Sequence, residues 1–527
     1  MTPSGASAIG CIAEYKPQEA CEGAGCGLAG GAGGHRPDPP KSCVPTDESW
    51  DPGEICRGVF VRASAPPGGD GSKERPFQHF AEAAAEKPER VYACGEVYTE
   101  DTGVIFHDGV EIYAGFTECE EAWRWSPEAR ATLKGPADAI ALTLNGGESR
   151  LENLDVVAEN ASAPGADSPG RSSIALLANG GTLAIVSSTL TAGNATSGAQ
   201  ARSISDDPTL DGIDGAPGVE ACGPGTMHEG PAGPITRCAD GQSAGGKGGD
   251  GGAVTGPVAN PTLSPAGNGT SGEPATSQPA EGAGGTGETA GQLCTRGADG
   301  AAGAPGEPAG ASEGLGTIDA AGYTGAPASR GRAGKPGQGG GGGGGARGGA
   351  ATCGGANEVL LPGASGGAGG SGGCGGQGGH GGHAGGSSIA LIVLDAAVTL
   401  DRVQLVSGNA GNGGPGARGQ VGGKGGSGGA PGDPAGDAQE SCAGGRGGRG
   451  GQGGPGGGGH GGHSLGVAFR GKQVRGISDV SFSHGDAGMG APGGGTSPNN
   501  GAQGANGLAQ ECWDFAANKA CSVSAPR

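Results

Sequence analysis

Apolar residues alternate with polar ones in short bursts, and four stretches of the chain repeat the same arrangement. Each stretch holds two or three bursts, separated by turn residues such as Asn-Gly-Gly or Gly-Asn. Alternation with a period of two residues predicts short β-strands rather than helices. The stretches are residues 139–161, 173–195, 388–410 and 464–487.

The constant length of these stretches predicts one repeated structural unit. The sequence separation from the first Ile or Leu to the closing Ala is 21, 21, 21 and 22 residues. A unit of this size with two or three strands fits one coil of a parallel β-helix, because each coil buries its inward face only by stacking on the next. Residues 90–101 and 104–116 predict two further coils, and the helical pattern at 77–86 predicts a cap over the open end.

Long glycine-rich segments interrupt the coils directly after the closing Gly-Asn-Ala, at residues 196–386 and 411–462. In residues 366–383 every triplet reads Gly-Gly-x, and residues 413–430 and 444–455 keep the same period. Shorter runs of glycine triplets occur elsewhere, and one of them begins at Gly322. A period of three predicts a helix with three residues per turn, the polyproline II geometry.

Three structures are compatible with such runs: a flexible linker, a collagen-like trimer, and a side-by-side bundle of polyglycine II helices. The strict triplet and the matched run lengths favour the bundle. The third residue of each triplet then lies on an outward edge, about 9 Å from the next one. The predicted edge residues are Cys374, Gln377, His380, His383, Arg446, Arg449 and Gln452.

Composition sharpens this expectation. The 527 residues include 128 Gly and 37 Pro, and only 3% are aromatic, which is too little for several conventional cores. The net charge of −21 argues against nucleic acid or an anionic membrane as partner, since both attract a basic surface. Scattered acidic residues leave Ca²⁺ as the one cofactor to consider, but no EF-hand loop or Ca²⁺-binding nonapeptide repeat is present, so no cofactor is predicted.

Fifteen cysteines are spread along the chain without a Cys-x-x-Cys motif, which favours disulfides over a zinc ribbon and predicts a location outside the cytoplasm. Residues 8–11, Ala-Ile-Gly-Cys, resemble the end of a bacterial lipoprotein signal, which makes Cys11 the lipidation candidate. The ten residues before Cys11 lack a basic and an apolar region, so they are not a functional signal as written. No apolar run approaches about 20 residues, so no transmembrane helix is predicted.

The sequence GGHGGH occurs twice and each copy precedes an apolar burst, so its histidines are the metal-ligand candidates. They are His380, His383, His460 and His463. Zinc ligands converge on one ion at about 2 Å, whereas side chains on one edge are about 9 Å apart. The favoured interpretation is that the histidines are edge residues at two corresponding junctions between a glycine run and a strand, and no metal site is predicted.

Polysaccharide lyases on β-helices use a cluster of Asp with Ca²⁺ plus a basic residue, and hydrolases use paired carboxylates. The candidates here are Asp155, Asp395, Asp401, Arg402 and Asp479. They do not occupy equivalent positions in adjacent coils, and strand alternation places Arg402 on the face opposite to Asp401. Solvated surface charge is therefore favoured, and no catalytic residue is predicted.

Residues 70–123 resemble the opening of pectin-lyase-like right-handed parallel β-helix domains. The matching segments are DGSKERPFQHFAEAAA, RVYACGEVYTE and VIFHDGVEIYAGF. In that family an Asp/Asn-Gly-Ser…Pro-Phe segment leads to a short capping helix and two coils, the second ending in Gly-Gly-Phe, where this chain has Ala-Gly-Phe. The chain is especially similar to glycine-rich, PE-PGRS-like secreted proteins of the myxobacterial type.

The resemblance covers about residues 55–195 and the two later coils, and it implies the fold rather than a function, because such helices carry lyases, hydrolases, adhesins and stalks alike. It also implies a disulfide between Cys94 and Cys119. Cys512 and Cys521 are the other disulfide candidates.

Together these observations predict an all-β chain, a right-handed parallel β-helix with glycine-rich insertions packed as polyglycine II helices. The expected division is a Cys/Gly/Pro-rich segment (1–55), cap and first coils (56–195), first insertion (196–386), coil (387–410), second insertion (411–462), and last coil with C-terminal cap (463–527). The expected function is a non-enzymatic structural or adhesion protein, extracellular or on the cell surface, such as an outer-membrane lipoprotein that contacts polysaccharide or other surface components. The alternative is a polysaccharide lyase or hydrolase-like enzyme.

Overall fold

The computed structural model describes residues 43–46, 49–50, 56–257, 260–278, 280–353, 355, 357–496 and 499–523. The chain divides into two units, residues 1–42 and 43–527, and the description below concerns the second. This unit is all-β, as the alternation predicts. Two largely parallel sheets of twelve and seven strands form a strongly curled, β-helix-like core. Among the described residues the one α-helix is α1 (Phe80–Ala85), whose Phe80 and Ala83 are buried in the core.

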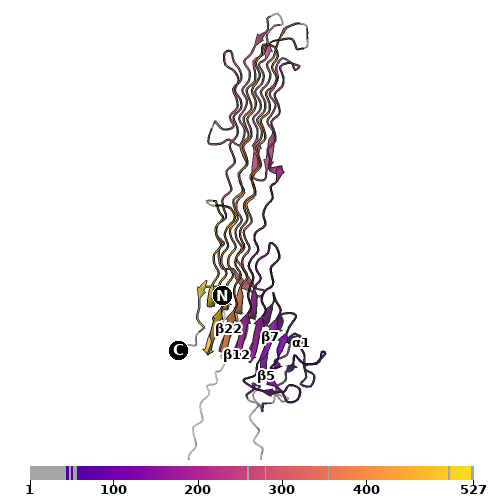
Figure 1. Cartoon of the computed structure of the whole chain (residues 1–527), viewed down its shortest axis with the longest axis vertical. Helices are drawn as coiled ribbons and strands as arrows, with labels where there is room; N and C mark the ends of the chain where they lie inside the picture. The colour runs from indigo at the N-terminus through magenta and orange to yellow at the C-terminus, as the bar shows by residue number, and fades with distance from the viewer. Residues whose placement is uncertain are drawn as a thin grey trace, which may run out of the picture. The chain divides into compact units, whose positions relative to one another are not determined.

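Each complete coil begins with a strand of the seven-stranded sheet and continues into the twelve-stranded sheet, where β12 and β22 lie side by side (Figure 1). The repeated stretches stack in register, with Ile174 paired to Ile140 on one side and to Ile389 on the other. The coil strands are β8 (Ile140–Asn145), β9 (Glu148–Glu152), β10 (Leu154–Ala158), β11 (Ser173–Asn179), β12 (Thr182–Ala192), β21 (Ser388–Leu394), β22 (Ala397–Ser407), β23 (Ser464–Arg470), β24 (Arg475–Ser478) and β25 (Ser481–His484).

The coils closer to the N-terminus differ from the expectation. Residues 90–101 and 104–116 each supply two strands rather than a whole coil, and a full turn extends from β4 through β5 to β7. The strands are β1 (Val59–Val61), β2 (Arg90–Cys94), β3 (Val97–Thr99), β4 (Val104–His107), β5 (Glu111–Thr117), β6 (Arg124–Trp125) and β7 (Ala131–Gly135).

The side of the coil from which the glycine-rich segments leave is closed by buried serines. The Ser173 hydroxyl accepts the Gly193 N–H (2.8 Å), and the Ser388 hydroxyl donates to the Gly193 carbonyl (2.7 Å) and accepts the Gly408 N–H (2.8 Å). Ser464 continues the series by donating to the Gly408 carbonyl (2.8 Å). These bonds hold the two ends of a coil together although long insertions separate successive coils along the chain.

The insertions form a glycine-rich layer of extended runs that lie side by side (Figure 1), and backbone N–H groups three residues apart on one run donate to the same neighbouring run. Gly447 donates to the Gly426 carbonyl (2.8 Å) and Gly450 to the Gly423 carbonyl (2.9 Å), so these two runs are antiparallel. The spacing of these bonds is the three-residue period of the sequence.

Residues 339–345 are seven consecutive glycines, and close neighbours surround them in three directions. A Cβ on Gly342 would lie 1.9 Å from the Lys247 carbonyl oxygen, and one on Gly344 would lie 1.8 Å from that of Thr286. The Gly-Gly-x pattern therefore changes to glycine alone where a run has no outward edge.

Short antiparallel hairpins and disulfides connect the runs. The hairpin strands are β13 (Ile235–Cys238) with β14 (Gly241–Ala244), β15 (Val254–Thr255) with β16 (Thr262–Leu263), β17 (Thr317–Asp319) with β18 (Gly322–Thr324), and β19 (Gly349–Ala351) with β20 (Val359–Leu361). A further hairpin, β26 (Ala509–Asp514) with β27 (Lys519–Ala520), lies in the seven-stranded sheet beside β23. Residues 322–324, counted above as a glycine triplet, belong to β18 instead.

Six disulfides are formed among the described cysteines. Three of them join distant parts of the glycine-rich layer: Cys222–Cys353, Cys238–Cys374 and Cys294–Cys442. The others are Cys43–Cys56, Cys94–Cys119 and Cys512–Cys521. The Cys94–Cys119 bond is the one that the resemblance implies, and the other candidates, Cys512 and Cys521, are bonded to each other, whereas Cys11 lies outside the described residues.

Candidate functional site

The two GGHGGH motifs lie in different environments. His380 is exposed, and the Nε2 of half-buried His383 lies 3.0 Å from a carboxylate oxygen of Asp167. His460 and His463 are fully buried, so the expectation that all four are edge residues is wrong for the second motif. The motifs do not correspond in register either, because His463 directly precedes β23 whereas four residues separate His383 from β21.

The buried His463 ring is held by backbone bonds at both nitrogens. Its Nδ1 accepts the Leu508 N–H (3.0 Å), so Nε2 carries the proton and donates to the Leu315 carbonyl (2.7 Å). Burial lowers the pKa of His463 to about 4. Neutral His463 therefore fastens the segments before β17 and β26 to the end of the glycine run.

His463 does not contribute to a metal site in this arrangement, since neither nitrogen has a free lone pair. Its ring packs edge-on against Tyr323 and His460, with centroids 5.3 and 5.5 Å away. The Nε2 of His460 is buried without a hydrogen-bond partner among the described residues. No group of three His, Cys, Asp or Glu in this part of the chain is placed to hold a metal ion.

The neutral state of His463 predicts a loss of stability in mild acid. Its folded pKa of about 4 lies below the usual histidine pKa of 6.5, so the unfolded chain binds the proton first. Stability from this group is complete above pH 6.5 and falls by up to about 3 kcal/mol as the pH drops to 4. Urea unfolding of His463→Gln between pH 4 and 7.5 should show a smaller decrease than wild type. His380→Gln, at an exposed position, is the control, and equal slopes in all three proteins would contradict the prediction.

The acidic candidates do not form a cluster. Asp155 forms an ion pair with Arg130 (2.7 Å), and Asp401 pairs with Arg402 (2.9 Å) and accepts a hydrogen bond from Ser478. The predicted opposite orientation of Asp401 and Arg402 is wrong, because Arg402 has a φ of 54° that interrupts the strand alternation. The remaining two, Asp395 and Asp479, are turn residues with φ of 52° and 45°.

The positive φ of Arg402 belongs to a column of bends in the twelve-stranded sheet. Asn153, Ser187 and Asp479 occupy the stacked positions and also have positive φ, between 45° and 56°. The column therefore has a structural role, since it turns each coil at the same point.

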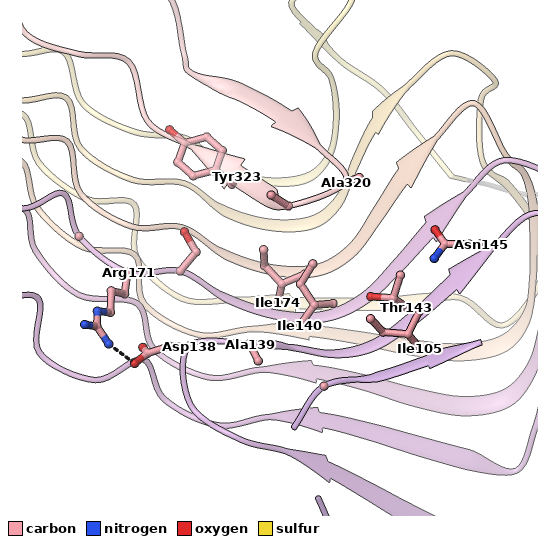
Figure 2. Close-up of a pocket in the computed structure, with 14 residues that line it drawn as sticks. Ile105, Asp138, Ala139, Ile140, Thr143, Asn145, Arg171, Ile174, Ala320 and Tyr323 are labelled. Carbon is pink, nitrogen blue, oxygen red and sulfur yellow. Dashed lines mark hydrogen bonds and ion pairs between the residues drawn. The ribbon is translucent and has the colours of Figure 1, made fainter. Parts of the chain in front are cut away.

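A groove of about 780 Å³ lies on the outer face of the seven-stranded sheet, beneath the tip of the β17–β18 hairpin (Figure 2). Ile105, Ile140 and Ile174, from β4, β8 and β11, form its apolar floor. Ala320 and Tyr323 of the hairpin bound the groove on the opposite side. Ile105 is 47% exposed. Sequence analysis missed this groove, because the covering hairpin lies in a glycine-rich insertion far from these strands in the chain.

Polar groups lie at the two ends of the groove. At one end Asp138 forms an ion pair with Arg171, and Ser162 hydrogen-bonds to both side chains. At the other end are Thr143 and Asn145 (Figure 2). Because the carboxylate of Asp138 is held by Arg171 and Ser162, this arrangement suits binding better than acid–base catalysis.

The fold and these sites define an all-β protein with a parallel, β-helix-like core and a disulfide-linked glycine-rich layer. Comparison with family models, with curated proteins and with solved structures finds no match. The pectin-lyase-like and PE-PGRS-like resemblance therefore stays a prediction. Among the described residues, no helix is long and apolar enough to cross a membrane.

Proposed function

We propose that this chain is a non-enzymatic structural or adhesion protein, extracellular or attached to the cell surface, whose glycine-rich layer is a polyglycine II bundle. The observation that carries the proposal is the cross-linking of this layer by three disulfides that span 131, 136 and 148 residues. Disulfides persist in oxidising compartments, which favours a location outside the cytoplasm. Lipidation of Cys11 would supply the attachment.

The exposed side chains of the glycine-rich layer suit a scaffold for binding. Backbone N–H groups of the glycine-rich layer bond to carbonyls of neighbouring runs, so side chains at third positions project from a braced framework. Exposed third-position residues include Gln377, Arg446, Arg449 and Gln452. The acidic candidates for catalysis are dispersed over separate strands and turns, which favours binding over an enzymatic role.

Fractionation of cells that produce the protein tests the location. We expect the protein at the surface or in the medium, with its cysteines protected from thiol reagents until a reductant is added. Replacement of Cys11 by serine should release a surface-attached form. Recovery in the cytoplasm with free thiols would contradict the extracellular assignment.

Incubation with polysaccharides tests the class of function. We expect retention of the protein on some polysaccharides without the appearance of new reducing ends or unsaturated products. Sustained depolymerisation by the purified chain would establish the alternative, a polysaccharide lyase or hydrolase.

A further inference from the structure

A basic hollow of about 390 Å³ lies on the surface of the glycine-rich layer, in a chain of net charge −21. Its lining includes the side chains of Lys424, Ser427, Arg446 and Arg449, with glycine backbone between them. All four residues are exposed. Three cations gathered on one surface repel one another, and an anion bound between them would relieve that repulsion.

The hydrogen-bond register of two antiparallel runs creates this hollow. The bonds from Gly447 to Gly426 and from Gly450 to Gly423 place Arg446 beside Ser427 and Arg449 beside Lys424. Third-position residues on each run are about 9 Å apart, so the cations form a row along the run rather than a point. Arg418, six residues before Lys424 on the same run, adds a cation on the far side of exposed Val421, and it lines two further hollows together with Gln452.

The cations of the hollow differ from others on the same layer. Arg332 pairs with Glu307 (3.2 Å) and Lys335 pairs with Asp240 (3.3 Å). Lys424, Arg446 and Arg449 have no carboxylate oxygen within 4.0 Å among the residues that the structure describes. Their charge is therefore available to a ligand.

Three carboxylates flank the hollow and take part in the backbone framework. Asp211 accepts the Lys424 N–H (2.7 Å), Asp214 accepts the Ser427 N–H (2.6 Å), and Asp299 accepts the Arg446 N–H (2.8 Å). These carboxylates confine the positive potential to the row between them, so the attraction is strongest for an anionic group that lies directly between the cations.

We propose that this hollow binds the carboxylate or sulfate groups of an acidic polysaccharide. Arginine fork geometry suits both groups, and a row of cations suits a linear chain with regularly spaced charges. No aromatic side chain lines the hollow to stack a nucleobase, and the net charge of −21 opposes nucleic acid. The proposal names a partner class for the proposed adhesion function and rests on it for the presence of that partner.

Binding of the full chain to polygalacturonate and to dextran sulfate, with uncharged dextran as reference, tests this site. Lys424→Ala, Arg446→Ala and Arg449→Ala should each weaken binding by about tenfold. Arg332→Ala and Lys335→Ala remove cations that already have carboxylate partners and should leave binding unchanged. Equal losses in both groups, or equal binding to uncharged dextran, would overturn the proposal.

A second set of variants separates electrostatics from damage to the fold. Asp211→Asn and Asp299→Asn keep an acceptor for the backbone N–H but remove a negative charge, so binding should tighten by about threefold. Unchanged or weaker binding would argue against an anion in the hollow. Stronger binding to single-stranded DNA than to either polysaccharide would overturn the ligand class. An affinity for dextran sulfate no higher than that for inorganic sulfate would overturn it as well. If the variants do not change binding, the anion site is wrong but the proposed adhesion function still stands. If the chain depolymerises a polysaccharide, the proposed function is wrong, and the binding of the variants still tests the anion site.

Discussion

Replacement of Gly342 by alanine is expected to destabilise the glycine-rich layer by about 4 kcal/mol. The added Cβ would lie 1.9 Å from the Lys247 carbonyl oxygen, so one run must move by more than 1 Å. Overpacking of this kind costs about 3 kcal/mol, and the loss of a buried hydrogen bond adds about 1 kcal/mol. The bond at risk is that from the Gly342 N–H to the Thr270 carbonyl (2.9 Å). Urea unfolding and amide hydrogen exchange of the layer measure the effect.

Gly310→Ala is the matched control for this experiment. Gly310 is exposed, does not have a positive φ, and a Cβ there would meet no atom within 4 Å. Alanine at such a position changes stability by about 0.5 kcal/mol or less, or stabilises slightly through the unfolded chain. If the two variants unfold alike, the runs around Gly342 are not packed as closely as described.

The repeats were the most predictable part of the fold. The nearly constant length of the four stretches predicted stacked coils, and Ile140, Ile174 and Ile389 pair as their alignment requires. The reason is local: alternation and turn residues in each stretch determine its strands, and stacking follows from the inward apolar face. The seven glycines at 339–345 also held a signal, since a run without any third-position side chain indicates a position enclosed on all sides.

The environment of His463 could not be predicted from its motif. Its burial depends on Leu315, Tyr323, Leu508 and Phe515, which approach from two other segments of the chain. His383 has the same place in the first copy, yet it is only half-buried and lies against Asp167. Contacts between distant segments thus decided which copy of GGHGGH is fully buried, and the groove beneath the β17–β18 hairpin was missed for the same reason.

Removal of the Cys294–Cys442 disulfide by a double substitution to alanine is expected to cost about 5 kcal/mol. The bridge closes a loop with a sequence separation of 148 residues, and the entropy that a cross-link removes from the unfolded chain grows with loop length. Removal of Cys512–Cys521, with a separation of 9, should cost only about 3 kcal/mol by the same relation. Non-reducing urea unfolding of both double variants provides the comparison.

The difference between these two disulfides tests why the glycine-rich layer needs cross-links. Ordering a residue costs about 1–2 kcal/mol, glycine loses more freedom than any other residue, and a backbone hydrogen bond returns only about 1 kcal/mol net. The layer has few apolar side chains to make up this deficit, so long disulfides that restrict the unfolded chain become a main source of its stability. Equal losses for the long and the short bridge would contradict this argument and would place the stabilisation in the folded contacts instead.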